Sequence, residues 1–122
     1  MKSQSFTVCE PLPGYNQLVK GHWAAQYHIK KKAKELVKWN AMRAGIRSVQ
    51  GRCEVRITCY EPNKRRDISN VRAGAEKVIL DALQELRIIK NDNWRWLEDV
   101  PTTVKYDKDC GRVEIEIREV EG

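Results

Sequence analysis

The residues best suited to chemistry lie in one charged segment and in a turn that follows the next helix. Residues 64–70 read Lys-Arg-Arg-Asp-Ile-Ser-Asn, and Asp67 falls between the end of a predicted strand and the start of a predicted helix. A carboxylate at such a junction is exposed on a rigid support, where it can bind a hard divalent cation. The second carboxylate, Asp92, follows that helix in the turn 91–93. These two segments form the candidate site.

The helix between the two carboxylates carries a polar stripe opposite its apolar face. The stripe consists, at helical spacing, of Asn70, Gly74, Lys77 and Asp81. A glycine costs a helix of the order of 1 kcal/mol, so Gly74 predicts the close approach of a neighbouring strand or a DNA backbone. Asp81 lies about 16 Å along the axis from the helix start, too far to share a metal ion with Asp67. We expect Asp81 to form an ion pair with Lys77 or to anchor a group of the site from outside the ligand shell.

Charge is unevenly distributed along the chain. Residues 1–66 contain 14 Lys or Arg and 4 Asp or Glu, whereas residues 67–122 contain 9 and 13. A basic half favours a polyanionic partner and carboxylates favour a divalent metal, so the pattern favours nucleic-acid chemistry. The candidate phosphate contacts are the turn cations Lys64, Arg65 and Arg66 and the helix lysines Lys30, Lys31, Lys34 and Lys38. For both groups, a solvated surface is the alternative interpretation.

The hydrophobic periodicity predicts an α/β fold in which a mixed sheet packs with two main helices in the order β-α-β-α-β-β. The predicted strands are 6–9, 52–60, 102–106 and 112–120, and the predicted helices are 22–44 and 70–86. The strand 52–60 alternates, with one face formed by Cys53, Val55, Ile57 and Cys59. We expect one domain over residues 1–122, because two domains would each be too small to bury a good core.

The composition excludes several classes of protein. The 122 residues are 41% hydrophobic and 33% charged, which excludes global disorder. No apolar run approaches the roughly 18 residues of a membrane span, and the first residues lack the apolar core of a secretion signal, so we expect a cytoplasmic protein. The four cysteines form no Cys-x-x-Cys pair and are expected to be buried free thiols. Neither histidine is expected to be catalytic.

The candidate site resembles the RusA-type Holliday junction resolvases, especially their phage-borne branch. The family pattern is Arg-Asp-x-Asp-Asn, then a helix with Lys-x-x-x-Asp-Ala-Leu, then an Asn/Asp-Asp turn. The chain matches this pattern at residues 66–70, 77–83 and 91–94. Its opening residues 12–16 are similar to the Leu-Pro-x-x-Asn of that branch. The resemblance covers nearly the whole chain in the right order.

The resemblance implies a homodimeric, Mg²⁺-dependent endonuclease, bacterial or phage-encoded, that cuts four-way DNA junctions symmetrically. Asp67 takes the position of the first family aspartate, Lys77 that of the helix lysine and Asp92 that of the aspartate in the second turn. Asp67 and Asp92 would then hold Mg²⁺, for which Mn²⁺ is a candidate substitute. Lys77 would offset the charge that develops on the transition state.

Ser69 departs from the family, which has aspartate at this position. The loss of one of three carboxylates weakens both the affinity and the geometry of a metal site. Ser69 is therefore expected to cap the helix or, with Asn70, to complete the ligand shell of the metal directly or through a water. The alternative function is a structure-selective DNA-binding homologue with weakened or no catalysis. A basic RNA-binding module is disfavoured, because no aromatic ribonucleoprotein motif is present.

Trp94 and Trp96 flank Arg95 beside the second carboxylate. They are candidates for stacking on bases at an opened junction, or for packing at the sheet edge or at a dimer contact. A homodimer is expected, because a four-way junction needs two cuts and one chain offers one carboxylate cluster. The apolar surface for the dimer would come from Trp94, Trp96 and Leu97 and from the tail 113–120, paired as an exposed edge strand.

Overall fold

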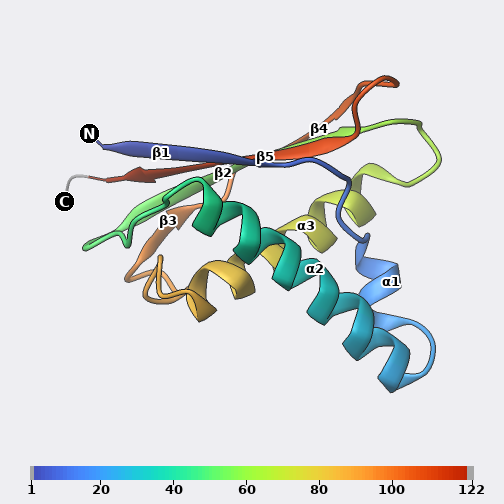
Figure 1. The fold of residues 1–122 in the computed structure, drawn as a ribbon, viewed down its shortest axis with the longest axis horizontal. Coiled ribbons are helices and arrows are strands. Elements are labelled where there is room, and N and C mark those ends of the chain that lie inside the picture. The colour runs from blue at the N-terminus through green and yellow to red at the C-terminus, as the bar shows by residue number, and fades with distance from the viewer. Residues whose placement is uncertain (1, 121–122) are drawn as a thin grey trace.

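The helices cover one face of a mixed β-sheet (Figure 1). The structure, a computed structural model, describes residues 2–120. Its elements are, in chain order, β1 (Ser3–Val8), α1 (Tyr15–Val19), α2 (Trp23–Arg43), β2 (Cys53–Glu61), α3 (Ile68–Glu85), β3 (Leu97–Asp99), β4 (Thr102–Tyr106) and β5 (Arg112–Glu119). The α/β class and the mixed sheet predicted from the sequence are confirmed.

All four predicted strands and both predicted helices are present, with their ends shifted by a few residues. Two further elements, α1 with 5 residues and β3 with 3, were not predicted. Segments this short show no measurable hydrophobic period. No helix within residues 2–120 combines the length and the apolar character needed to cross a membrane.

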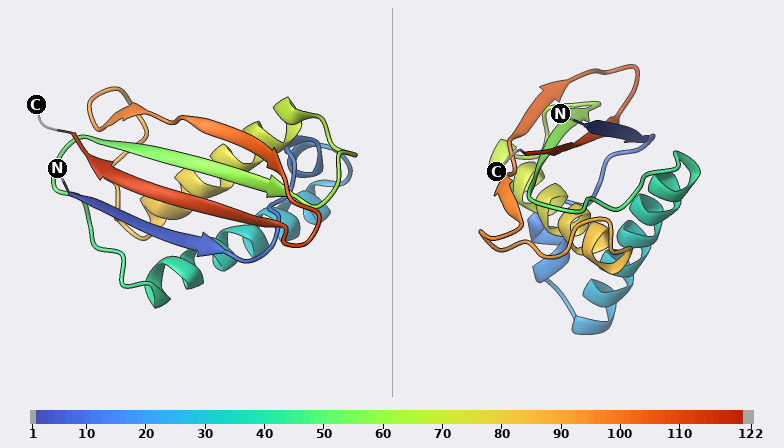
Figure 2. Two further views of the ribbon diagram at one scale, coloured as in Figure 1. Left: turned by 90° about the horizontal axis from the view of Figure 1, so that it is seen from above. Right: turned by 90° about the vertical axis from the view of Figure 1, so that its left-hand side faces the viewer.

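The last strand, β5, lies inside the sheet rather than at its edge. It runs antiparallel to β1 on one side and to β2 on the other, so that Ile115 pairs with both Phe6 and Ile57 (Figure 2). The expectation that the tail 113–120 offers an exposed edge is therefore wrong. Among residues 2–120, the outer edges of the sheet are β1 and the successive strands β3 and β4, which both run parallel to β2.

The core lies between the sheet and the two long helices. The predicted apolar face of β2 is fully buried, with Cys53, Val55, Ile57 and Cys59 at most 1% exposed. Burial disfavours the thiolate and is the main cause that raises the pKa of Cys53 to about 11 and that of Cys59 to about 12. Cys9 and Cys110 are exposed, so the expectation of buried free thiols is correct for two cysteines and wrong for the other two.

Three of the four α2 lysines that were candidates for phosphate contact pair with α3, whereas Nζ of Lys31 lies 6.0 Å from the ring centre of Tyr27. Lys30 pairs with Asp81 at 3.0 Å, and Lys34 pairs with Glu85 at 2.7 Å. Lys38 also pairs with Glu85. Hydrogen bonds from Lys34 and Lys38 lower the pKa of Glu85 from its ordinary value. These three lysines therefore join the two helices, which leaves less of their charge for a polyanionic partner.

Candidate functional site

Asp67 occupies the position immediately before α3. Its backbone is extended and its carbonyl oxygen accepts a hydrogen bond from the backbone N–H of Val71 at 3.0 Å, as a helix-capping residue does. Its carboxylate makes no capping hydrogen bond and the residue is exposed. Ser69 already lies in the first turn of the helix, so the expectation that it caps α3 is wrong. The capping position thus presents an unengaged carboxylate to solvent.

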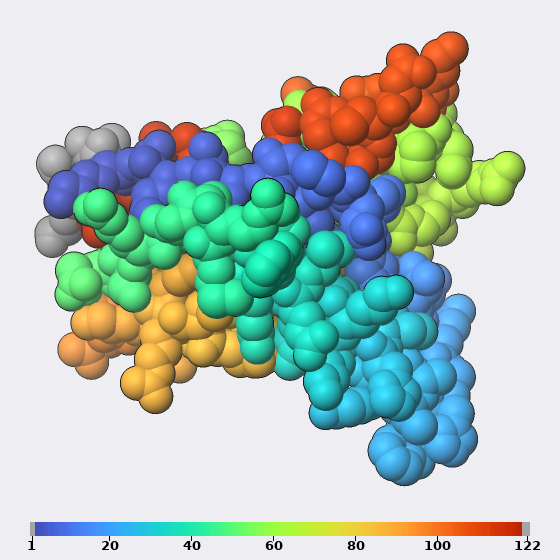
Figure 3. Space-filling view, viewed as in Figure 1, coloured from blue at the N-terminus to red at the C-terminus, as the bar shows by residue number. Residues whose placement is uncertain are grey.

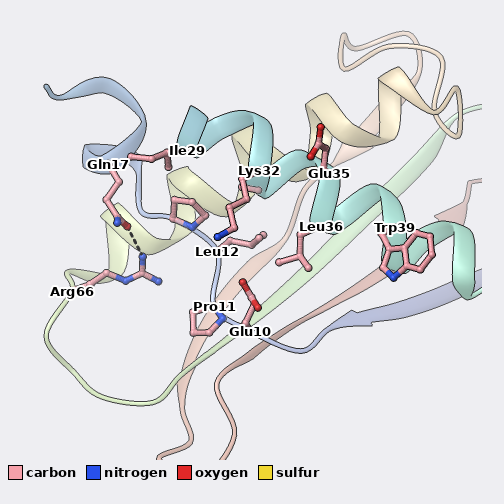
Figure 4. A pocket seen from close by; sticks show the side chains of 12 residues that line it. Glu10, Pro11, Leu12, Gln17, Ile29, Lys32, Glu35, Leu36, Trp39 and Arg66 are labelled. Carbon is pink, nitrogen blue, oxygen red and sulfur yellow. Dashed lines mark hydrogen bonds between the residues drawn. The ribbon is translucent and has the colours of Figure 1, made fainter. Parts of the chain in front are cut away.

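Arg66 and Glu61 fix the turn that carries Asp67. Glu61 is only 7% exposed, and its two carboxylate oxygens accept hydrogen bonds from Nε and Nη2 of Arg66 at 2.8 and 2.9 Å. A two-point pair of this kind restrains both side chains. Nη1 of Arg66 also donates to Oε1 of Gln17 at 3.3 Å (Figure 4). Arg66 is therefore engaged by protein groups and positions the turn.

Asp67 lines a cavity of about 760 Å³ between the start of α3 and the end of β4, which we call the Asp67 pocket. Besides the Glu61–Arg66 pair, its charged lining consists of Asp67, Lys64, Arg72 and Lys105. Nζ of Lys64 lies 5.1 Å from the ring centre of Tyr106, and Nε of Arg72 donates to the Thr102 carbonyl at 3.1 Å. Within residues 2–120 none of these three cations forms an ion pair with a carboxylate. The pocket therefore favours an anion.

Three of the pocket residues, Arg72, Lys105 and Tyr106, were not identified from the sequence. A signal existed for Arg72, which lies three positions after Ser69 and so on the same helix face. No local signal existed for the other two. They reach the pocket because β4 pairs in parallel with β2, which sets Tyr106 opposite Glu61.

Asp67 directly precedes α3 and Asp92 follows it, so the two carboxylates belong to opposite ends of this helix. Figure 1 shows α3 running along the face of the sheet. The 18 residues of α3 separate the two, a length of about 27 Å. The strands agree with this separation. The segment that carries Asp92 leads into Leu97, which pairs with Cys53 at the start of β2, whereas Asp67 follows Glu61 at the end of β2. The nine residues of β2 span roughly 26 Å.

One chain therefore does not bring the two predicted metal ligands together. Within the part of the chain that the structure describes, no group of three or more His, Cys, Asp or Glu side chains could hold a metal ion. In the Asp67 pocket, the other carboxylate belongs to Glu61 and is paired with Arg66. Magnesium requires several oxygen ligands, usually including one or two carboxylates and waters. Asp67 and Asp92 of one chain are therefore too far apart to bind the same metal ion.

Lys77 is also remote from Asp67. It lies 10 positions further along the chain, about 15 Å along the helix axis. Its Nζ lies 3.4 Å from the carboxylate of Asp81, which confirms the ion pair predicted between these two residues. The structure thus places Lys77 outside the Asp67 pocket of its own chain.

Asn70 and Gly74 hold α1 and the preceding loop against α3. Oδ1 of Asn70 accepts a hydrogen bond from the backbone N–H of Asn16 at 2.8 Å. A Cβ atom on Gly74 would lie 2.2 Å from the carbonyl oxygen of Pro13. The close approach expected at Gly74 is present, but the approaching backbone belongs to the loop before α1 rather than to a strand or to DNA.

The two tryptophans have different surroundings. Trp94 is 91% exposed. Trp96 is half-buried, with Nζ of Lys90 and Cζ of Arg95 at 4.5 and 5.1 Å from its ring centre, and its carbonyl accepts a hydrogen bond from the backbone N–H of Cys53. Trp96 therefore packs at the sheet edge, whereas Trp94 projects beside Asp92.

A second cavity, of about 710 Å³, lies between the loop 10–13 and α2 (Figure 4). The space-filling view shows the surface hollowed on the side where α1, α2 and the turn after β2 meet (Figure 3). The apolar residues that line this second cavity include Leu12, Ile29, Leu36 and Trp39. Arg66 lines both cavities and so separates this apolar groove from the charged Asp67 pocket.

The comparison with known families supports the motif resemblance. The model of the family Endodeoxyribonuclease RusA matches residues 13–118 of the 122-residue chain. The match includes all three helices, the turn with Asp92, and all of the sheet except β1 and the last residue of β5. No curated protein matches the chain significantly. The chain belongs to the RusA endodeoxyribonuclease family.

Proposed function

We propose that the protein resolves four-way (Holliday) DNA junctions by paired phosphodiester hydrolysis, with Mg²⁺ as cofactor and Mn²⁺ as a substitute. Membership of the RusA family supports DNA cleavage. The observation that carries the proposal is the Asp67 pocket, in which an exposed carboxylate lies beside three cations that no carboxylate within residues 2–120 neutralises. The proposal includes one nuclease domain over residues 1–122, acting in the bacterial cytoplasm on chromosomal or phage DNA.

The charges of the pocket suit a phosphodiester. Each phosphate of DNA carries one negative charge, and further charge develops on its oxygens as the bond to the leaving group breaks. Lys64, Arg72 and Lys105 would bind the oxygens of the scissile and flanking phosphates without reading sequence. Asp67 is the proposed catalytic carboxylate. The exposed Arg65 would extend the phosphate contacts beyond the pocket.

The proposed metal ligands are Asp67 and Asp92, with Ser69 and Asn70 as further candidates. Ser69 lines the Asp67 pocket and is exposed. Asn70 already uses its Oδ1 to hold the N–H of Asn16. Because Asp67 is the one unengaged carboxylate that residues 2–120 supply to this pocket, the fit to a divalent cation is incomplete within those residues.

The remaining predicted cations belong to the proposal as contacts outside the pocket. Lys77 is exposed on α3 and pairs with Asp81. Lys30 and Lys34 lie on the adjoining side of α2, where they pair with Asp81 and Glu85. We propose that these lysines contact the arms of the junction, where each contributes a salt-dependent attraction to phosphate.

The second candidate function is a structure-selective DNA-binding protein with little or no cleavage. The observation that favours it is Ser69, which lines the pocket at a position where the resemblance implies aspartate. Both functions use the same basic surface, so binding of DNA does not separate them. Cleavage does.

The experiment uses a labelled synthetic four-way junction and a linear duplex of the same sequence, each with Mg²⁺, Mn²⁺ or a chelator. The nuclease proposal predicts paired nicks in opposing strands of the junction, no nicks in the duplex, and no nicks with the chelator. Tight binding of the junction without metal-dependent nicks would contradict the nuclease proposal and favour the binding protein.

A further inference from the structure

One side of α2 carries aromatic and lysine side chains in a single row, which we call the α2 face. It consists, at spacings of three or four residues, of Trp23, Tyr27, Lys31, Lys34 and Lys38. Residues at these spacings lie on the same face of a helix. Trp23 is 74% exposed and Tyr27 is 58% exposed, so neither ring is needed by the core. Exposed rings gathered beside charged side chains indicate a surface that binds another molecule.

The carboxylates in the groove between α2 and α3 each hold two lysines. Asp81 pairs with Lys30 at 3.0 Å and with Lys77 at 3.4 Å. Glu85 is likewise shared by two lysines of the α2 face. Because one carboxylate neutralises one ammonium group, each set of three charges remains positive. The two acids therefore restrain the lysines in position without removing the positive charge of the groove.

Lys31 adds a further positive charge to this groove. In the part of the chain that the structure describes, it forms no ion pair with a carboxylate. Its Nζ lies 6.0 Å from the ring centre of Tyr27. A cavity of about 200 Å³ lies beside them, and Tyr27 lines it together with four lysines of α2 and with Glu35 and Glu85. Four ammonium groups against two carboxylates favour an anionic ligand here.

We infer that the α2 face binds an unpaired DNA strand, whose bases stack on Trp23 and Tyr27 while its phosphates contact the lysines. The inference deepens the proposed function and rests on it for the identity of the polyanion. An aromatic ring stacks on a base whose face is open, as in a single strand, and a positive groove beside it follows the backbone. Lysines four positions apart are about 6 Å apart along the helix, a spacing similar to that of the phosphates in an extended strand. One surface thus matches both parts of this ligand.

The aromatic end of the α2 face lies toward the start of α3. Lys30 pairs with Asp81 and Lys34 pairs with Glu85, four positions further along each helix, so α2 and α3 run in the same direction. α1 contacts both helices and lies beside the start of α2 (Figure 1). The α2 face and the Asp67 pocket have no residue in common. Substitutions on the α2 face therefore leave the proposed nuclease site unchanged.

Binding of a fluorescent oligothymidine, measured by anisotropy with a chelator present, tests the inference without cleavage. Trp23→Ala and Tyr27→Ala should each weaken binding of this single strand about tenfold, whereas binding of a duplex of the same length should change by less than about twofold. Tyr27→Phe keeps the ring and should bind as the wild type does. Lys31→Ala should reduce the slope of log K against log salt concentration by about 0.7, the value for one phosphate of a single strand.

The matched controls are Trp39→Ala and Lys32→Ala, which remove the same side chains from the other side of α2, at the second cavity (Figure 4). Each should change binding of the single strand by less than about twofold. Equal losses in Trp23→Ala and Trp39→Ala would overturn the inference. A change from dimer to monomer in Trp23→Ala with no loss of single-strand affinity would assign the α2 face to a second copy of the chain, and would also overturn it.

Photochemical cross-linking of the wild-type protein locates the bases without relying on the folding of a variant. An oligothymidine that contains 5-iodouracil is irradiated in the complex, and the attached peptide is identified by mass spectrometry. Attachment at Trp23 or Tyr27 is expected, because iodouracil reacts with aromatic rings that stack on it. Attachment at other residues alone, or no attachment, would overturn the inference.

A four-way junction with and without a single-stranded extension on one arm separates two sources of the unpaired strand. Trp23→Ala should weaken binding of the extended junction alone if the strand is an extension, and of both junctions if the centre opens. No weakening in either case would overturn the inference and leave the proposed function intact. A wild-type protein that cross-links to the oligothymidine at Trp23 or Tyr27 but nicks no junction would contradict the proposed nuclease function instead.

Discussion

At the scale of single residues, we expect position 69 to determine how well the Asp67 pocket can hold a divalent cation. Ser69 lies in the first turn of α3 and lines the pocket. Ser69→Asp adds an anionic oxygen there, and an acidic residue near a helix N-terminus also stabilises the helix by about 0.3–1 kcal/mol. We expect Mn²⁺ affinity or the cleavage rate to rise about tenfold, with the fold retained.

Ser69→Asn is the matched control, because asparagine has the size of the aspartate in Ser69→Asp but carries no charge. It should leave metal affinity and cleavage within about twofold of the wild type. A stable Ser69→Asp protein that gains neither metal affinity nor rate would show that this position does not face the metal.

Lys105 tests whether the pocket, rather than the charge of the whole chain, binds the scissile phosphate. Lys105→Ala should lower kcat/KM for a four-way junction about tenfold and reduce the salt dependence of binding by about one phosphate contact. Lys20→Ala removes the same charge from the end of α1, outside the Asp67 pocket, and should change kcat/KM by less than about twofold. Equal losses in the two variants would contradict a phosphate-binding role for the pocket.

The site residues that could be predicted from the sequence are those identified by local pattern. Asp67 stands out because it separates a strand from a helix, which predicts an exposed carboxylate. The structure agrees, since Asp67 is exposed and its carboxylate makes no capping hydrogen bond. The ion pair between Lys77 and Asp81 follows from helical spacing. Lys105 could not be found in this way, since its place depends on the pairing of strands that lie more than 40 residues apart in the chain.

At the scale of elements, α3 is held in place by a backbone contact that only glycine allows. Gly74→Ala improves helix propensity by about 1 kcal/mol, but its Cβ would lie 2.2 Å from the Pro13 carbonyl oxygen, so α1 and its loop must move. We expect a net loss of about 2 kcal/mol or more in the free energy of unfolding, measured by denaturant titration. We also expect slower cleavage, because the contact from Arg66 to Gln17 depends on α1.

Gly51→Ala is the control for this substitution, since nothing lies within 4 Å of the added Cβ and the backbone is not strained. It should change the free energy of unfolding by less than about 0.5 kcal/mol. Equal stability of the Gly74→Ala protein and the wild type would contradict the close packing of α1 on α3.

The pairing of α2 with α3 makes stability depend on pH. The pKa of Glu85 is lowered because Lys34 and Lys38 donate hydrogen bonds to it, so these pairs stabilise the fold above the ordinary carboxyl pKa of about 4.3. The contribution is lost as the pH falls through the lowered pKa. Because the Glu85 side chain is 42% exposed, Glu85→Gln should cost only about 0.5 kcal/mol at pH 7.

The same substitution should cost nothing once the pH lies below the lowered pKa of Glu85. Glu35→Gln, on the exposed side of α2, is the control and should be neutral at both pH values. Thermal unfolding of the three proteins across the acid range is the measurement. A loss that is independent of pH would show that the Gln variant acts through packing rather than through the ion pairs.

Sequence periodicity predicted the long elements because each helix and strand has one buried face. It did not place β5. The alternation of Val113, Ile115 and Ile117 with polar residues predicts a strand, and the apolar tail 113–120 is expected at an exposed edge, yet β5 is the strand between β1 and β2. The alternation of apolar and polar residues along a strand shows that one face of the sheet is buried. It does not show whether the strand has neighbouring strands on both sides. The helices cover one face of this sheet, so an interior strand alternates as well.

At the scale of the whole molecule, the separation of Asp67 and Asp92 is the main difference from the predicted site. The helix-rise argument that separates Asp81 from Asp67 applies more strongly to Asp92, which follows the end of α3. The sequence could not show whether the chain folds back after the helix. The structure shows instead that it turns toward the start of β2, which leaves Asp92 and Asp67 at opposite ends of α3.

The most direct test of the proposed function is junction cleavage by the Asp67→Asn protein. Asparagine caps helices as well as aspartate does, and the Asp67 carboxylate makes no capping hydrogen bond, so the variant should fold with unchanged thermal stability. Metal-dependent nicking of a synthetic four-way junction should fall by about a hundredfold or more, while the Kd for the junction stays equal or decreases because a negative charge has been removed. Undiminished nicking by a folded Asp67→Asn protein would contradict the assignment of this pocket as the nuclease site.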